Sequence, residues 1–243
     1  MDGKQRIVKE EEMKRTLYVS DLDGTLLNRQ SVLSETTIAT LNRILQEKKA
    51  LFTIATARTP ATVVDLMKEV KCSLPFVLMA GAVLWNDSKQ NYERVRAIPS
   101  ATVDKLLEIY GHYTIRPFIY RRHGNCLFVY HTFELTESER QFIEPRIQSP
   151  FKRLVTAESL TAQDPDDSVL VYSMGSYATL LNIANEIRAS QLPCTLSCYQ
   201  DIFDCSQGIL EIYAPKTTKA EAIDYLAKQC HAERVVVFGD NLN

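Results

Sequence analysis

Short apolar runs alternate with longer amphipathic segments between residues 16 and 79, and this alternation constrains the fold more than any other feature. The short runs are typical of buried strands, and the longer segments repeat apolar residues at helical spacing. Such alternation predicts a parallel sheet covered by helices, with ligands bound beyond the carboxyl ends of the strands. The expected strands are 16–20, 50–55 and 76–79; the expected helices are 34–48, with Ser34 as N-cap, and 59–70, with Pro60 in the first turn.

After Gly81 the pattern changes to paired strand-like runs. These runs predict a separate α+β domain inserted into the parallel-sheet core. We therefore expect an α/β protein with a Rossmann-like parallel-sheet core and an inserted α+β domain. Within and after the insertion, the expected strands are 115–120, 127–131, 168–173, 194–199, 203–205, 209–213 and 234–238, with a hairpin turn at 121–125; the expected helices are 103–110, 136–147, 177–189 and 218–228.

Composition excludes several classes of protein. The 243 residues are 45% hydrophobic and carry a net charge of −2, which is ordinary for a globular chain and lacks the basic stripe of most nucleic-acid binders. No apolar stretch is long enough for a membrane span. The charged start, residues 1–16, lacks the apolar core of a secretory signal, so we expect a cytoplasmic protein. Its six cysteines are therefore expected to be reduced and buried; a zinc site is the weaker alternative.

The segment Asp21-Leu22-Asp23-Gly24 follows the first expected strand and carries the strongest chemical signal. Two carboxylates so close together repel each other unless a cation or a proton relieves them. Gly24 permits a tight turn whose backbone N–H groups can face a phosphate. An ordinary surface turn is the alternative interpretation, because Asp and Gly favour turns.

This segment, continued by Thr25, resembles the D-x-D-G-T motif of the haloacid dehalogenase-like (HAD) superfamily. Later segments match that family in order: Thr56-Ala57-Arg58 after the second strand, Lys219 at the start of a helix, and Gly239-Asp240 with Asn243 near the end. The resemblance covers the whole chain and is strongest to the Cof-like subfamily, whose large α+β cap has a class IIB architecture. It implies that the inserted domain is this cap, at residues 83–208, and that residues 1–82 and 209–243 form the core.

The resemblance also implies a role for each matched residue. Asp21 is expected to be the nucleophile that attacks phosphorus, Asp23 the general acid and base, and Lys219 the cation that counters charge in the transition state. The implied magnesium ligands are Asp21, the backbone carbonyl of Asp23, and Asp240. The implied phosphate-binding residues are Leu22, Thr56, Ala57, Arg58, Lys219 and Asn243, with Arg58 at the pocket rim or simply a solvated charge.

The implied function is a magnesium-dependent phosphatase that hydrolyses small phosphorylated metabolites, such as sugar phosphates, through an aspartyl phosphate. The alternatives are a catalytically weak or inactive member that binds phosphate or a partner, a phosphomutase, and a response-regulator-like receiver, which the large insertion disfavours. The cap is expected to select the substrate. Its polar and aromatic run could contact the substrate or form a solvated hairpin; the residues are Tyr120, Arg121, Arg122, His123 and Tyr130.

The sequence departs from the family pattern in two respects that bear on function. The family motif continues with an aspartate after Asn243, where this sequence ends, so we expect a C-terminally incomplete core, weaker metal binding and an exposed apolar edge at 235–238 that favours self-association. Ala80 stands where relatives usually carry asparagine, which removes a polar group near the expected pocket.

Overall fold

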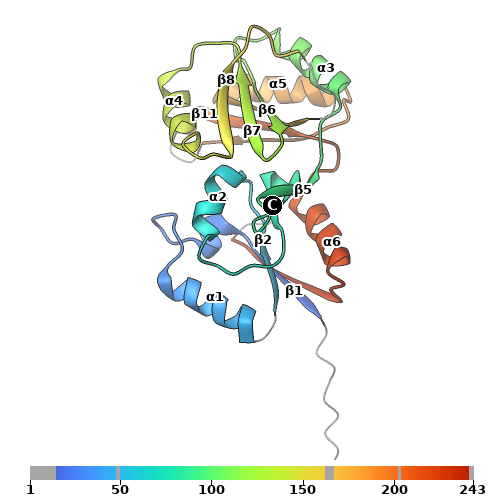
Figure 1. Cartoon of the computed structure of the whole chain (residues 1–243). Coiled ribbons are helices and arrows are strands. Elements are labelled where there is room, and N and C mark those ends of the chain that lie inside the picture. Colours follow the sequence, from blue (N-terminus) through green and yellow to red (C-terminus); the bar gives the residue numbers. More distant parts are fainter. Residues whose placement is uncertain (1–14, 48–49, 162–166, 202–203, 241–243) are drawn as a thin grey trace, which may run out of the picture.

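The computed structural model describes residues 15–47, 50–161, 167–201 and 204–240. Figure 1 shows two stacked lobes, each built around a sheet. The lower lobe contains a parallel sheet in the order β12-β1-β2, flanked by helices. This arrangement confirms the predicted α/β fold with a parallel-sheet core. Its elements are β1 (Thr16–Ser20), α1 (Glu35–Glu47), β2 (Leu51–Ile54), α2 (Pro60–Met67), α6 (Lys219–Gln229) and β12 (Arg234–Phe238).

The helices of the lower lobe begin where local chemistry predicts. The hydroxyl of Ser34 accepts a hydrogen bond from the N–H of Thr37 at 3.1 Å, and that of Thr218 accepts from the N–H of Glu221 at 3.1 Å. Pro60 occupies the first turn of α2, where no N–H is needed. Helices α1 and α2 pack on one face of the parallel sheet and α6 packs on the other, so both faces are covered.

An antiparallel sheet continues the lower lobe through β3 (Phe76–Leu78), β4 (Val83–Asn86) and β5 (Asn91–Val95). Strand β3 joins the parallel sheet through a single bridge between Ala55 and Val77. Hydrogen bonding thus places β4 and β5 with the lower lobe, although they follow the boundary expected at residue 83. The reason is that β4 folds back directly onto β3.

The upper lobe contains a six-stranded sheet in the order β10-β11-β9-β6-β7-β8. Strand β11 pairs with β9 and β10, so residues expected in the core from 209 onward bond to the upper sheet. Helices α3 and α5 pack on one face of this sheet. The elements are α3 (Ser100–Tyr110), β6 (Phe118–His123), β7 (Cys126–His131), α4 (Glu137–Ile143), β8 (Lys152–Thr156), β9 (Ser168–Ser176), α5 (Tyr177–Ala189), β10 (Thr195–Gln200) and β11 (Gln207–Tyr213).

Three local expectations differ from the structure. The hairpin turn expected at 121–125 is shorter, because β6 continues to His123 and pairs with β7 up to Cys126. Of the strand expected at 203–205, Phe203 lies outside the described residues, and the two residues after it form no strand. All six cysteines are free, and only Cys126 and Cys230 are buried, whereas Cys205 is exposed.

The face of the upper sheet opposite α3 and α5 looks toward the lower lobe. Alternation along β6 and β9 turns Tyr120, Leu170 and Tyr172 to this face, where they join one apolar cluster with the lower-lobe helix α2. The chain crosses between the lobes twice, and Arg96 links the crossings by donating a hydrogen bond to the carbonyl of Pro215 at 2.6 Å. None of the described helices is both long and apolar enough to cross a bilayer.

Candidate active site

The carboxylate of Asp21 lies at the carboxyl end of β1, where the parallel sheet places it. Its backbone N–H donates to the carbonyl of Phe238 at 2.9 Å, which continues the pairing of β1 with β12. Its Oδ1 accepts from the N–H of Leu22 at 2.7 Å, and its Oδ2 accepts from Nζ of Lys219 at 2.9 Å. The first turn of α6 thus brings a cation to a carboxylate 198 residues away in the sequence.

The turn after Asp21 is held in a compact form. The N–H of Leu27 donates to the carbonyl of Leu22 at 2.9 Å, and Gly24 has a φ of 74°, in the region that favours glycine. A Cβ at Gly24 would lie only 2.5 Å from Oδ2 of Asp240. The positive φ thus favours glycine at this position, and the carboxylate of Asp240 lies close against the backbone of the turn.

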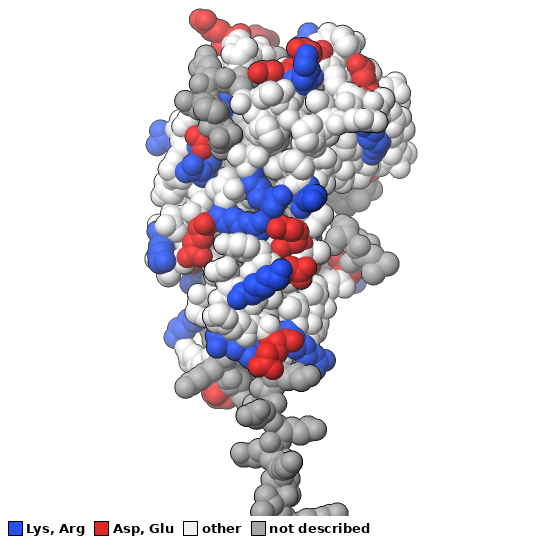
Figure 2. Space-filling view, turned by 90° about the vertical axis from the view of Figure 1, so that its right-hand side faces the viewer, with Lys and Arg blue, Asp and Glu red and all other residues white. Residues whose placement is uncertain are grey.

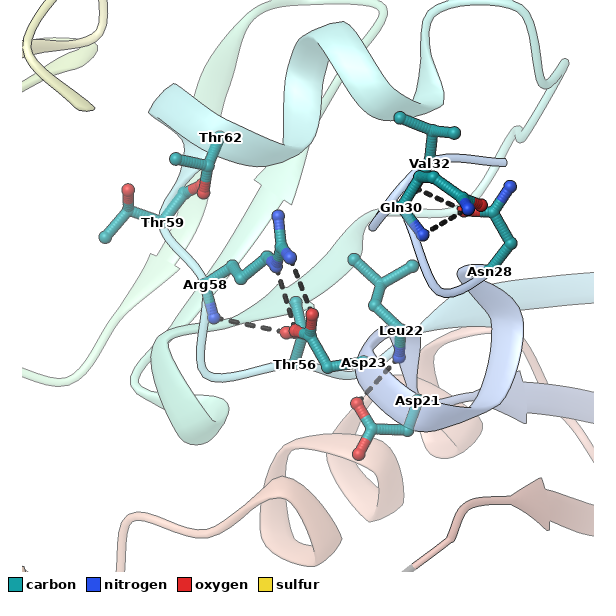
Figure 3. A network of polar contacts seen from close by, with 10 residues as sticks. All are labelled: Asp21, Leu22, Asp23, Asn28, Gln30, Val32, Thr56, Arg58, Thr59 and Thr62. Carbon is teal, nitrogen blue, oxygen red and sulfur yellow. Dashed lines mark hydrogen bonds and ion pairs between the residues drawn. The ribbon is translucent and has the colours of Figure 1, made fainter. Parts of the chain in front are cut away.

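The side chain of Arg58 reaches from the end of β2 to Asp23. Its Nε donates to Oδ2 of Asp23 at 2.8 Å and its Nη2 to Oδ1 at 2.6 Å, which is the bidentate arrangement that guanidinium and carboxylate favour (Figure 3). Thr56 is buried, and its hydroxyl accepts from the N–H of Arg58 at 3.2 Å. The structure thus brings both expected segments to one edge of the parallel sheet.

The remaining expected site residues are placed less directly. The side chain of Leu22 is fully buried, so only its backbone can face a ligand. Ala57 is exposed beside Arg58. Asn243 lies outside the described residues.

A short turn at Met79–Gly81 supports the site through backbone hydrogen bonds, a role that was not predicted beyond the expected position of Ala80 near the pocket. The N–H of Met79 donates to the carbonyl of Arg58 at 3.0 Å, and the N–H of Ala80 donates to the carbonyl of Thr56 at 3.1 Å. A Cβ on Gly81 would lie 2.2 Å from the carbonyl oxygen of Thr218, the N-cap of α6. This turn therefore fixes the loop after β2 against the start of the helix that carries Lys219.

The acidic groups at this edge suit a hard cation. The carboxylates of Asp21 and Asp240 approach the turn from two strands, and oxygen donors of this kind are those that magnesium favours. Within the described part of the chain, no group of three or more His, Cys, Asp or Glu side chains is arranged to hold a metal ion. The described residues thus offer the carboxylates of Asp21 and Asp240 at this edge, with no third acidic side chain arranged beside them.

A cavity of about 180 Å³ lies between the lobes, next to the candidate active site. Ala57 and Arg58 line it from below, and side chains of the upper sheet line it from above. Of the polar hairpin expected to contact a substrate, Tyr120 reaches this cavity. Arg121 is instead buried and donates to the carbonyls of Leu160 and Thr161 at 3.0 and 2.8 Å, which is a structural role.

The remaining hairpin residues bond within the upper lobe: Arg122 pairs with Asp167, and His123 contacts the hydroxyl of Tyr130. The charged residues that the upper lobe contributes to the cavity were not predicted from the sequence; they are Arg146, Lys152 and Glu211. On the face shown in Figure 2, acidic and basic side chains lie next to one another, and no broad area of one charge sign is seen.

Comparisons with known proteins agree with this geometry. The family model of the haloacid dehalogenase-like hydrolases matches residues 18–243. A solved haloacid dehalogenase-like hydrolase from Bacteroides thetaiotaomicron has a TM-score of 0.71 and 19% identity, with 93% of this chain and 82% of that chain covered. No curated protein is significantly similar in sequence.

Two further solved structures are similar. A phosphatase of the haloalkanoate (HAD) enzyme superfamily from the same species has a TM-score of 0.70 and 18% identity, with 98% of this chain and 81% of that chain covered. A HAD subclass IIB sugar phosphatase has a TM-score of 0.66 and 15% identity, with 93% and 81% covered. At identities this low, the likeness concerns the fold.

Proposed function

Because the chain belongs to the haloacid dehalogenase-like hydrolase family, as its motifs predicted, we propose that it is a magnesium-dependent phosphatase of small phosphorylated metabolites. The observation that carries the proposal is the contact between Asp21 and Lys219 beside Asp23. A nucleophilic carboxylate, a cation for phosphoryl oxygens and a second carboxylate are the groups that phosphoryl transfer to an aspartate requires.

The reaction proceeds in two steps that use the chain's own residues. A carboxylate oxygen of Asp21 attacks phosphorus and the bond to the leaving oxygen breaks, which produces an aspartyl phosphate. Asp23, protonated once its contact with Arg58 opens, gives its proton to the leaving oxygen and then takes a proton from the water that hydrolyses the intermediate. Lys219 and the hydroxyl of Thr56 hold phosphoryl oxygens, and the amine of Lys219 offsets the charge that develops on them.

Magnesium is the cofactor we assign to this site. Asp21, the backbone carbonyl of Asp23 and Asp240 would hold it through hard oxygen donors. When bound, it neutralises the charge shared by the phosphate and the carboxylates. The cavity above the site would hold the part of the substrate that is not transferred.

The test is phosphate release from p-nitrophenyl phosphate and a panel of sugar phosphates, with magnesium or with a chelator. We expect release that requires magnesium, and an Asp21→Asn variant without detectable turnover. Asp65→Asn is the matched control, because Asp65 is exposed on α2. Release by the wild type no greater than that of Asp21→Asn would instead favour an inactive member of the family. Product analysis separates hydrolysis from transfer to a second hydroxyl, as in a phosphomutase.

A further inference from the structure

We propose that the cavity between the lobes is a subsite for an anionic group at the end of the substrate that is not transferred. This inference rests on the proposed phosphatase function and narrows the substrate class. The substrates would be small phosphorylated metabolites that carry a second anionic group, either a carboxylate or a second phosphate. The cavity adjoins the catalytic loop through Arg58, which lines it and also contacts Asp23.

Two cationic side chains of the upper lobe enter this cavity without a carboxylate partner. Arg146 stacks on the ring of Phe142, with its guanidinium carbon 3.9 Å from the ring centroid, and donates to the carbonyl of the same residue. The amine of Lys152 lies 5.3 Å from the ring centroid of Tyr120. Among the described residues, no Asp or Glu lies within ion-pair distance of either cation.

Burial makes the charge of Lys152 costly in the absence of a ligand, and that of the half-buried Arg146 to a smaller extent. The side chain of Lys152 is only 4% exposed, and its burial together with the nearby Arg146 lowers its pKa to about 7. Burial also lowers the pKa of Arg146. Buried charges are retained where a partner of opposite sign compensates them. An anion in the cavity supplies that partner to both cations at once.

The one carboxyl group lining the cavity does not balance them. Glu211 projects from β11, and burial raises its pKa to about 7, so near neutral pH a large share of these side chains is protonated and uncharged. Lys152, whose pKa is also lowered to about 7, is charged to a similar extent, so these two groups offset each other and Arg146 supplies the net positive charge. The cavity stays electropositive at neutral pH.

Unpaired hydroxyl groups line the cavity from both lobes. The hydroxyl of Tyr172, from β9, and that of Thr59, at the N-cap of α2, are buried and have no hydrogen-bond partner among the described residues. A buried donor without a partner is costly. Both can donate to the oxygens of an anion held between Lys152 and Arg146, which gives the subsite hydrogen bonds as well as charge.

The test compares substrates that share a skeleton but differ in one anionic group. For a carboxylate we would compare 3-phosphoglycerate with glycerol 3-phosphate, and for a second phosphate fructose 1,6-bisphosphate with fructose 6-phosphate. In at least one pair we expect kcat/KM to favour the anionic member by about tenfold or more, the effect of one charge-assisted contact. The pair that shows the preference identifies the anion.

Lys152→Met and Arg146→Gln should each reduce that preference ratio severalfold, and Lys105→Met, at an exposed helix position, should leave it unchanged. No preference in either pair, or a preference that survives both cavity variants, overturns the subsite. Turnover of p-nitrophenyl phosphate that requires Asp21 would then show that the phosphatase proposal still holds.

Calorimetric binding provides a readout that does not depend on turnover. The same pairs are titrated into the Asp21→Asn protein, whose cavity residues are intact. Tighter binding of an anionic member, weakened by adding Lys152→Met, supports the subsite even if no substrate is hydrolysed. Equal affinity within both pairs overturns it.

Discussion

At the scale of single residues, Lys152 and Glu211 line one cavity, and burial moves their pKa values toward each other. The pKa of Lys152 falls to about 7 and that of Glu211 rises to about 7. Arg146 faces Lys152 and adds to the fall. The phenols that face these two residues have raised pKa values and stay neutral; they are Tyr120, Tyr172, Tyr199 and Tyr213.

The lowered pKa of Lys152 predicts a stability cost that grows as pH falls. Between pH 10.5 and pH 7 the unfolded chain binds this proton and the folded chain does not, so wild-type stability decreases toward pH 7. Lys152→Met removes this dependence. We expect its advantage in unfolding free energy to increase by up to about 1.4 kcal/mol per pH unit from pH 9 to pH 7, measured by urea denaturation. Lys105→Met should show no such slope, and a pH-independent advantage for Lys152→Met would contradict the prediction.

Glu211 predicts the opposite slope. Its pKa in the folded state, about 7, lies above its unfolded value of 4.5, because burial disfavours the charged form. The folded state keeps its full stability below pH 4.5, where the carboxyl group is protonated in both states, and loses stability as pH rises through 7. Glu211→Gln should therefore gain stability over the wild type as pH rises from 5 to 7, with no further change above. Thermal unfolding across this range checks the prediction, with Glu137→Gln, at an exposed position of α4, as the control. An advantage that shrinks as pH rises would show that Glu211 is ionised and paired.

At the scale of elements, the turn at Met79–Gly81 joins the loop after β2 to the start of α6. Its residues have φ values of 51°, 55° and 96°, which is unfavourable for the non-glycine residues Met79 and Ala80. Ala80→Gly should stabilise the fold by up to about 1 kcal/mol in denaturant unfolding, because it relieves this conformation. A loss of stability would show that the alanine methyl group packs usefully.

Gly81→Ala tests the same turn in the opposite direction. Its Cβ would lie 2.2 Å from the backbone oxygen of Thr218, and its φ of 96° is strained for any other residue. We expect a loss of about 2–4 kcal/mol in unfolding free energy, together with reduced phosphatase activity because Lys219 shifts. Unchanged stability and activity would mean that the turn does not position α6.

Local signals predicted most elements, whereas long-range contacts decided the rest. Helix caps such as Ser34 and Thr218 act within one turn, so the sequence placed α1 and α6 well. The cavity was not predicted, because Arg146, Lys152 and Glu211 come from segments that only sheet pairing brings together. Strands β4 and β5 were not predicted for a similar reason: their pairing with β3 leaves no trace in hydrophobic periodicity.

The candidate active site was more predictable than the cavity because parallel strands impose its geometry. Asp21 follows β1 and Thr56 closely follows β2, and adjacent parallel strands bring their carboxyl ends together. The partner of Arg58 was not predictable, since a surface arginine after a strand has many possible neighbours. Its bidentate contact with Asp23 became evident only from the structure.

At the scale of the whole molecule, β12 forms an edge of the parallel sheet among the described residues. Val237 is 58% exposed and Phe238 49% exposed, and β12 pairs with β1 on its inner side. An exposed apolar edge strand can pair with another chain through its free backbone groups. This exposure supports the self-association expected from the sequence, which stays a prediction.

Light scattering at increasing protein concentration tests this association. We expect the average mass of the wild type to rise with concentration, and Val237→Lys to keep it close to 27.6 kDa, because a charge on an edge strand opposes pairing. Val32→Lys is the matched control: Val32 is 46% exposed but lies in the loop before α1. Equal association of both variants would place the contact elsewhere, and a wild type that stays monomeric at all concentrations would show that β12 does not pair. Asp240, which we propose as a magnesium ligand, follows closely after the end of β12. Association that persists at saturating magnesium would therefore show that metal binding and strand pairing are independent.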